Sequence, residues 1–176
     1  CTILLTLWKI CCVDMTPKRK ITIEGATLKA ESLCARAEYS AAEIMKRLLV
    51  WGISRGDAEK IVDSLIDQGF IDDQRFAMAY VRQQAIYARW GQRKIIMAMY
   101  TKGIDRSTIN EALESITTEQ WIEGATSLAC AKARTMGEID YNAKVKIYRH
   151  LASRGYDAST INAALKNLTR KDDELD

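Results

Sequence analysis

The chain contains an internal repeat, and this feature limits its possible folds more than any other. Gly52, Gly103 and Gly155 follow one another at intervals of 51 and 52 residues. Residues 103–113 read GIDRSTINEAL and residues 155–165 read GYDASTINAAL, so eight of the eleven positions are identical. The stretch after Gly52 is a looser copy. Because periods of roughly 20–50 residues are typical of stacked supersecondary units, the sequence predicts three copies of one small unit.

Each copy has the pattern of three helices. Ahead of each glycine, apolar residues recur at helical spacing, namely Ile44 and Leu48, Ile95 and Met99, and Ile147 and Leu151. The glycine can adopt the left-handed conformation that ends a helix. Ser54, Asp105 and Asp157 then offer side-chain oxygens that cap the next helix. The first helix of each unit is the most variable and is expected at about residues 26–38, 73–89 and 119–136.

The chain is therefore predicted to be all-α, with three tandem three-helix units in an elongated, curved array. No segment alternates between apolar and polar residues for more than a few positions, as a half-buried strand would. We expect the units at residues 26–71, 72–118 and 119–170, followed by an acidic tail at 171–176. Two helices joined by a short glycine turn also give the outline of a helix-turn-helix motif, an outline that many helical repeats share.

Residues 1–25 are expected to form a leader that is partly foreign to the natural chain or disordered. Residues 1–14 are largely apolar but lack the basic lead and cleavage site of a signal peptide, and the sequence from Met15 resembles a natural start. No run of about 20 apolar residues is present to cross a membrane. The five cysteines include no CxxC pair, a usage that suits a reducing compartment. We expect a monomeric, cytoplasmic protein.

The sequence offers few groups for catalysis. His150 is the one histidine, and no nucleophile motif or phosphate-binding glycine loop is present. Asp72 and Asp73 would suit acid–base or metal chemistry, but they stand at a predicted helix start. Carboxylates there stabilise the helix through capping and through its dipole. We therefore predict a protein that is not an enzyme and that uses no metal or cofactor.

Basic side chains are the main candidates for a binding surface. Arg75, Arg82 and Arg89 lie seven residues apart, so on one continuous helix they would form a stripe. Further cations follow in the second and third units, namely Arg93, Lys94, Lys102, Arg106, Lys144, Lys146 and Arg149. Such residues bind phosphates or acidic patches of a partner. The alternative is an ordinary solvated face, because the net charge is only +3.

Aromatic residues interleave with these cations and could stack on nucleic-acid bases. Their helical spacing assigns Tyr80 and Tyr100 to the core. Tyr87 and Trp90 stand beside the expected turn and are the better candidates for exposure.

Several segments, taken in order and at their spacing, resemble a known family. They are residues 37–43 (AEYSAAE), 48–52 (LLVWG), 69–77 (GFIDDQRFA), 80–82 (YVR), 91–95 (GQRKI) and 102–105 (KGID). Over roughly residues 26–168 the chain resembles the RecX family of bacterial recombinase regulators. Met99 and Ala98 depart from the leucine and the acidic residue that are usual at these positions.

The resemblance implies a modulator of the recombinase RecA. Members of this family are curved arrays of three-helix repeats that lie in the groove of the RecA filament on single-stranded DNA. There they block filament growth or favour disassembly, so recombinase, ATPase and co-protease activities fall, and with them the SOS response. The expected partners are therefore the RecA filament and single-stranded DNA, which is contacted directly or through the filament.

Two other interpretations fit the residues. One is a DNA-binding protein that acts through helix-turn-helix-like units without RecA, and its affinity would depend steeply on salt. The modest net charge argues against this as a sole function. The other is a helical scaffold for an unrelated protein, in which the basic surface is incidental.

Overall fold

The computed structural model describes residues 21–136 and 139–173, and most of the predicted leader and half of the acidic tail lie outside these ranges. The described chain is helical, without a strand. Its elements are α1 (Ile23–Cys34), α2 (Ala41–Val50), α3 (Arg55–Asp67), α4 (Asp73–Arg82), the π-helical turn η2 (Gln83–Tyr87), α5 (Gln92–Thr101), α6 (Arg106–Glu114), α7 (Thr118–Ala133), α8 (Tyr141–Ser153) and α9 (Ala158–Asp173).

The predicted caps and breakers define the ends of these helices. The side chains of Ser54, Asp105 and Asp157 accept hydrogen bonds from backbone N–H groups in the first turns of α3, α6 and α9. A glycine with positive φ follows each of α2, α5 and α8, at 89° for Gly52, 77° for Gly103 and 94° for Gly155. Both predictions are confirmed.

Helix α1 begins earlier than predicted. The side chain of Thr22 accepts a hydrogen bond from Gly25 N–H and thereby caps a helix that starts at Ile23. The helix ends at Cys34, four residues before the expected end at 38.

The first helix of the second unit also differs from the predicted range of 73–89. α4 ends at Arg82, and the chain continues as η2, where Ala88 N–H bonds to the Gln83 oxygen five residues back. Arg89 then has a positive φ of 52° and lies beyond the helix. A π turn holds more residues than an α turn, so the seven-residue spacing stops repeating on one face. The expected stripe of Arg75, Arg82 and Arg89 is broken.

Buried apolar residues form two separate hydrophobic cores. The first lies among α1, α2 and α3 and includes the fully buried Leu48 and Leu65. The second is shared by α4 to α9 and extends from Phe76 to Leu168. Helix α7 contacts η2 as well as α8 and α9. The last two groups of three helices therefore share their apolar interior, whereas the first group has its own.

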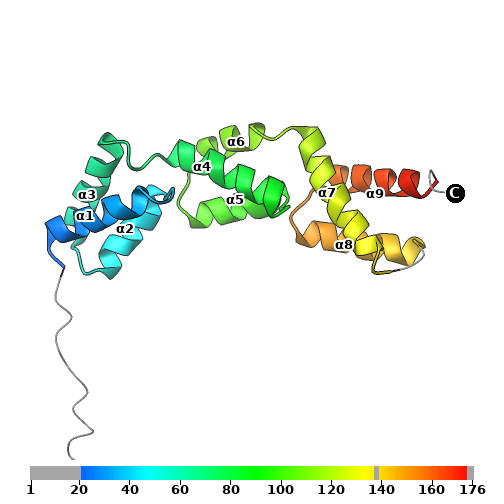
Figure 1. The fold of residues 1–176 in the computed structure, drawn as a ribbon, viewed down its shortest axis with the longest axis horizontal. Helices are drawn as coiled ribbons and strands as arrows, with labels where there is room; N and C mark the ends of the chain where they lie inside the picture. The colour runs from blue at the N-terminus through cyan, green and yellow to red at the C-terminus, as the bar shows by residue number, and fades with distance from the viewer. Residues whose placement is uncertain (1–20, 137–138, 174–176) are drawn as a thin grey trace, which may run out of the picture.

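The helices follow one another along an elongated array (Figure 1). The groups α1–α3, α4–α6 and α7–α9 succeed each other from one end to the other. The middle helices α2, α5 and α8 lie along the lower edge in this view, and α6 and α9 lie along the upper edge (Figure 1). The predicted all-α repeat architecture is confirmed.

Candidate interaction surface

The first and second groups of helices meet at a polar contact, which we call the first joint. Ser40, the N-cap of α2, donates its hydroxyl hydrogen to the backbone oxygen of Lys102 at 2.7 Å. The Lys102 ammonium in turn binds Glu43 Oε1 at 2.7 Å. A Cβ on Gly103 would lie 2.4 Å from the Cβ of Ala42. The start of α2 therefore sits directly on the turn that follows α5.

Asp73 also belongs to the first joint. Asp72 caps α4 as predicted, by accepting from the N–H groups of Gln74 and Arg75. Asp73 instead accepts the Ala41 N–H of α2 at 2.9 Å. Burial raises the pKa of the Asp73 carboxyl, although the Ala41 hydrogen bond favours its charged form. The predicted capping role of Asp73 is thus corrected, because it caps the helix across the joint and not its own.

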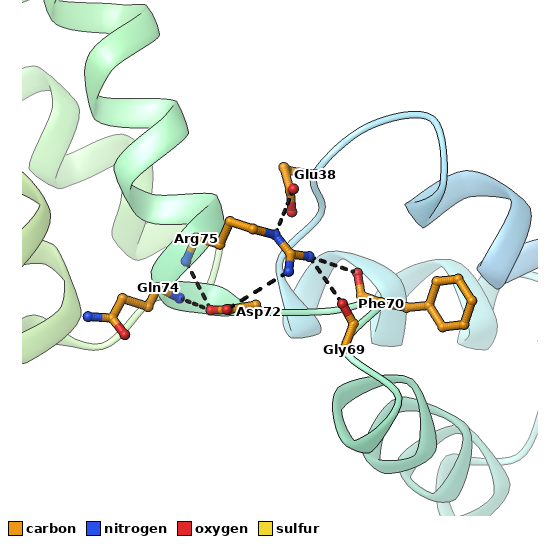
Figure 2. A network of polar contacts seen from close by, with 6 residues as sticks. All are labelled: Glu38, Gly69, Phe70, Asp72, Gln74 and Arg75. Atoms are coloured by element: carbon orange, nitrogen blue, oxygen red, sulfur yellow. Dashed lines mark hydrogen bonds and ion pairs between the residues drawn. The ribbon is translucent and has the colours of Figure 1, made fainter.

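Arg75 binds the segment between α3 and α4 at the same joint (Figure 2). Its Nε donates to Glu38 Oε1 at 2.7 Å, and Glu38 lies in the loop between α1 and α2. Its Nη2 donates to the backbone oxygens of Gly69 and Phe70 at 3.3 and 3.4 Å. The guanidinium therefore ties the segment that leads into α4 to the first group of helices.

The second joint repeats this geometry with different chemistry. Gly91 N–H, at the start of α5, donates to the backbone oxygen of Arg154 after α8 at 2.9 Å. A Cβ on Gly155 would lie 2.6 Å from the Cβ of Lys94. Lys94 stands 51 residues after Glu43 and occupies the corresponding place in its unit. Lys94 and Arg154 thus stand at the positions that Glu43 and Lys102 hold at the first joint, but they form no ion pair among the residues that the structure describes. The close contact relies on backbone hydrogen bonds and glycine.

The joints change the set of candidate binding residues. Arg75 and Lys102 are engaged between units, and the Lys94 ammonium lies 4.2 Å from the centre of the Trp90 ring. Lys144 is half-buried, and the remaining candidates are exposed. Within the described ranges, these candidates form no ion pair: Arg82, Arg89, Arg93, Arg106, Lys144, Lys146 and Arg149.

The aromatic residues divide differently from the prediction. Tyr87 is 80% exposed, as expected, and Tyr80 is half-buried and stacks on Phe76 with the ring centroids 5.7 Å apart. Trp90 is half-buried against the second core, so its predicted exposure is only partial. Tyr100 is 46% exposed, so its predicted core position is wrong. It lies in the last turn of α5.

The described residues contain no cluster of three or more His, Cys, Asp or Glu side chains arranged to hold a metal. His150 is half-buried in α8, and burial lowers its pKa, aided by Lys132 and Arg154. A neutral imidazole is therefore favoured at neutral pH. Among the helices that the structure describes, none combines the length and apolarity needed to cross a membrane.

These features define a class of protein, namely a helical repeat array with exposed cations in its second and third groups of helices. The model of the second three-helix domain of RecX matches residues 72–113, and that of the third three-helix domain of RecX matches residues 118–165. The chain belongs to the RecX family.

Similar proteins cover most of the chain. Regulatory protein RecX from Xanthomonas oryzae pv. oryzae is 34% identical over 155 residues, which span 87% of this chain and 96% of that protein. Regulatory protein RecX from Acinetobacter baylyi is 30% identical over 155 residues, spanning 87% and 95%. The crystal structure of RecX from Lactobacillus salivarius has the same fold, with a TM-score of 0.77 at 24% identity over 84% of this chain and 96% of that one. The relatives support a regulatory role.

Proposed function

We propose that the protein binds RecA and its filament on single-stranded DNA and inhibits filament extension. Recombinase, ATPase and co-protease activities would fall as a consequence, with effects on homologous recombination, DNA repair and the SOS response. Membership of the RecX family supports this role. The observation that carries it is an elongated array with exposed, unpaired cations in its middle and last units. Such a shape suits a long groove bordered by protein and phosphate, and we expect the protein to act there as a cytoplasmic monomer.

The proposed mechanism places the middle unit across neighbouring RecA subunits. Arg82, Arg89 and Arg93 would supply charge complementary to acidic RecA surface or to DNA. Arg75 and Lys102 have a different task, because each forms an ion pair between the first unit and the second. We therefore assign partner binding to the exposed cations, and the joining of the first two units to the paired ones.

The proposal is tested by the ATPase activity of RecA on single-stranded DNA, with RecA of the same organism. The protein is titrated well below the RecA concentration. Loss of ATPase activity at such ratios indicates action on filaments, because each molecule of the protein then inhibits many RecA subunits. No effect at any ratio, with the protein shown to be folded, would overturn the proposal. Inhibition only at stoichiometric excess that added DNA relieves would point instead to competition for the strand.

Substitutions test the assignment of the cations. Arg82→Ala or Arg93→Ala should weaken filament binding without lowering helical content, because both side chains are exposed and neither forms an ion pair in the described chain. Arg55→Ala is the matched control, since it removes an exposed arginine from α3, where it pairs with Glu59. If Arg82→Ala, Arg93→Ala and the control all bind filaments normally, the cationic face is only solvated.

A further inference from the structure

The three middle helices form a row along one edge of the array. The start of α2 contacts the turn after α5 through Ser40 and Lys102, and the start of α5 contacts the turn after α8 through Gly91 and Arg154. The helices therefore follow one another end to end (Figure 1). They contain 10, 10 and 13 residues, so at about 1.5 Å per residue the row is about 50 Å long. We call α2, α5 and α8 the middle-helix row.

The middle-helix row is almost free of carboxylates. Its one acidic residue is Glu43, and the Lys102 ammonium already neutralises that charge. Its cations form no ion pair within the described part of the chain, and they are Lys46, Arg47, Arg93, Lys94, Lys144, Lys146 and Arg149. The row therefore carries an excess of positive charge.

The third helices of the first two units have the opposite balance. α3 and α6 together carry three Lys or Arg residues and six carboxylates. Both cations of α3 are paired, Arg55 with Glu59 and Lys60 with Asp57. In the first two units the charge is therefore divided between the middle and third helices and not spread evenly, which a solvated surface without a partner does not require.

Exposed tyrosines lie among the cations of the row. Tyr141 is 79% exposed, Tyr100 is 46% exposed and Tyr148 is 36% exposed. Tyr141 and Tyr148 are seven residues apart on α8, so both face the same side of the helix as Lys144. Cations that follow a backbone, with aromatic rings on which bases stack, are the combination that binds single-stranded nucleic acid without sequence preference.

We infer that the middle-helix row binds single-stranded nucleic acid directly, with its cations on the phosphates and its tyrosines on the bases. The inference rests on the proposed function, which leaves the route to the strand undecided between direct contact and contact through the filament. A polyanion fits this surface better than a protein does, because a protein surface of mixed charge would be matched by both signs. Apart from Glu43, which Lys102 neutralises, the row offers one sign only.

The test is fluorescence anisotropy of a labelled oligothymidylate, without RecA, over a range of salt concentrations. The row variant is Lys144→Gln, Lys146→Gln and Arg149→Gln. The matched control is Arg36→Gln, Arg55→Gln and Lys60→Gln, which removes the same charge from the first unit outside the row. Losing three phosphate contacts should reduce the slope of log affinity against log salt by about 2. The control variant should keep the slope of the unmodified protein.

A second variant separates stacking from charge. Tyr141→Leu removes a highly exposed ring, so folding should be unaffected. We expect affinity for the single strand to fall about tenfold, from the typical contribution of one stacked base, with an unchanged salt slope. Affinity for a duplex of the same length should be weaker from the start and should not respond to this variant.

Three results would overturn the inference. The first is an equal loss of salt slope in the row and control variants, and the second is an unchanged slope in the row variant. The third is oligonucleotide binding that requires RecA, which would make the row a protein-binding face. The RecA ATPase assay is run in parallel with the same proteins. If oligonucleotide binding is absent while the ATPase still falls, this inference fails and the proposed function stands. If the strand is bound through the row and the ATPase is unaffected, this inference stands and the proposed function fails.

Discussion

At the residue scale, the glycine that follows the middle helix has a different structural role in the first unit from its role in the other two. Gly52, Gly103 and Gly155 all have positive φ, which a residue with a Cβ adopts at a cost of about 1–2 kcal/mol. Gly103 and Gly155 also receive the start of a neighbouring middle helix, whereas a Cβ on Gly52 would meet nothing within 4 Å. At Gly52, glycine is needed only for the positive φ of the turn. At Gly103 and Gly155 it is also needed to leave room for the neighbouring helix.

This difference predicts the order of two alanine variants. Gly52→Ala should lower the free energy of unfolding by about 1 kcal/mol through the backbone alone. Gly103→Ala should cost at least about 1 kcal/mol more, because overpacking against Ala42 adds strain. Urea unfolding followed by circular dichroism measures both. Equal losses of unfolding free energy in the two variants would mean that α2 can shift away from the added methyl group without strain.

A second residue-scale prediction concerns acid. Hydrogen bonds from Ser107 and Thr108 hold the pKa of the Asp105 carboxyl well below its ordinary value of 3.8. A lowered folded-state pKa stabilises the fold above the ordinary value, and the contribution is lost as the pH falls toward the folded-state pKa. Asp105→Asn keeps a capping oxygen but cannot ionise. Unfolding measured between about pH 2 and pH 7 should show a shallower acid-side decline for the variant, and an identical decline would contradict the prediction.

At the element scale, the features that the sequence predicts well are decided within one helical turn. The caps formed by Ser54 and Asp105 are examples, since their partners lie two or three residues away, and so are the glycine breakers. Contacts between units were not predictable in this way. Arg75 and Lys102 were candidate binding residues, but their partners Glu38 and Glu43 lie 37 and 59 residues away in the chain. Only the fold brings these charges together.

The π turn after α4 is another element that local patterns did not reveal, and it leads to a prediction. Arg89 ends that segment with a positive φ of 52°, which is unfavourable for any residue except glycine. Arg89→Gly should raise the free energy of unfolding by about 1 kcal/mol, and Arg89→Ala should not. Urea unfolding of both variants checks this. If alanine stabilises as much as glycine, loss of the arginine charge is the cause and not relief of the backbone.

At the scale of the whole molecule, the two joints differ in what surrounds them. The second joint lies within a continuous core shared by α4 to α9, so separating those units would expose apolar surface. The first joint lies between two cores and is held by the ion pairs of Arg75 and Lys102, the Asp73 cap and the Ser40 hydroxyl. Partly exposed ion pairs contribute little each. The first unit should therefore open independently of the other two.

Core truncations test this division. Leu48 and Leu151 are both fully buried, one in each core, and replacing either with alanine should cost about 2–5 kcal/mol. Leu48→Ala should speed amide hydrogen exchange in α1, α2 and α3 while α4 to α9 keep their protection. Leu151→Ala should speed exchange in both the second and third units, because they share the damaged core. Faster exchange throughout the chain in Leu48→Ala would show instead that the first joint couples the units, and the array would then act on its partner as one rigid body.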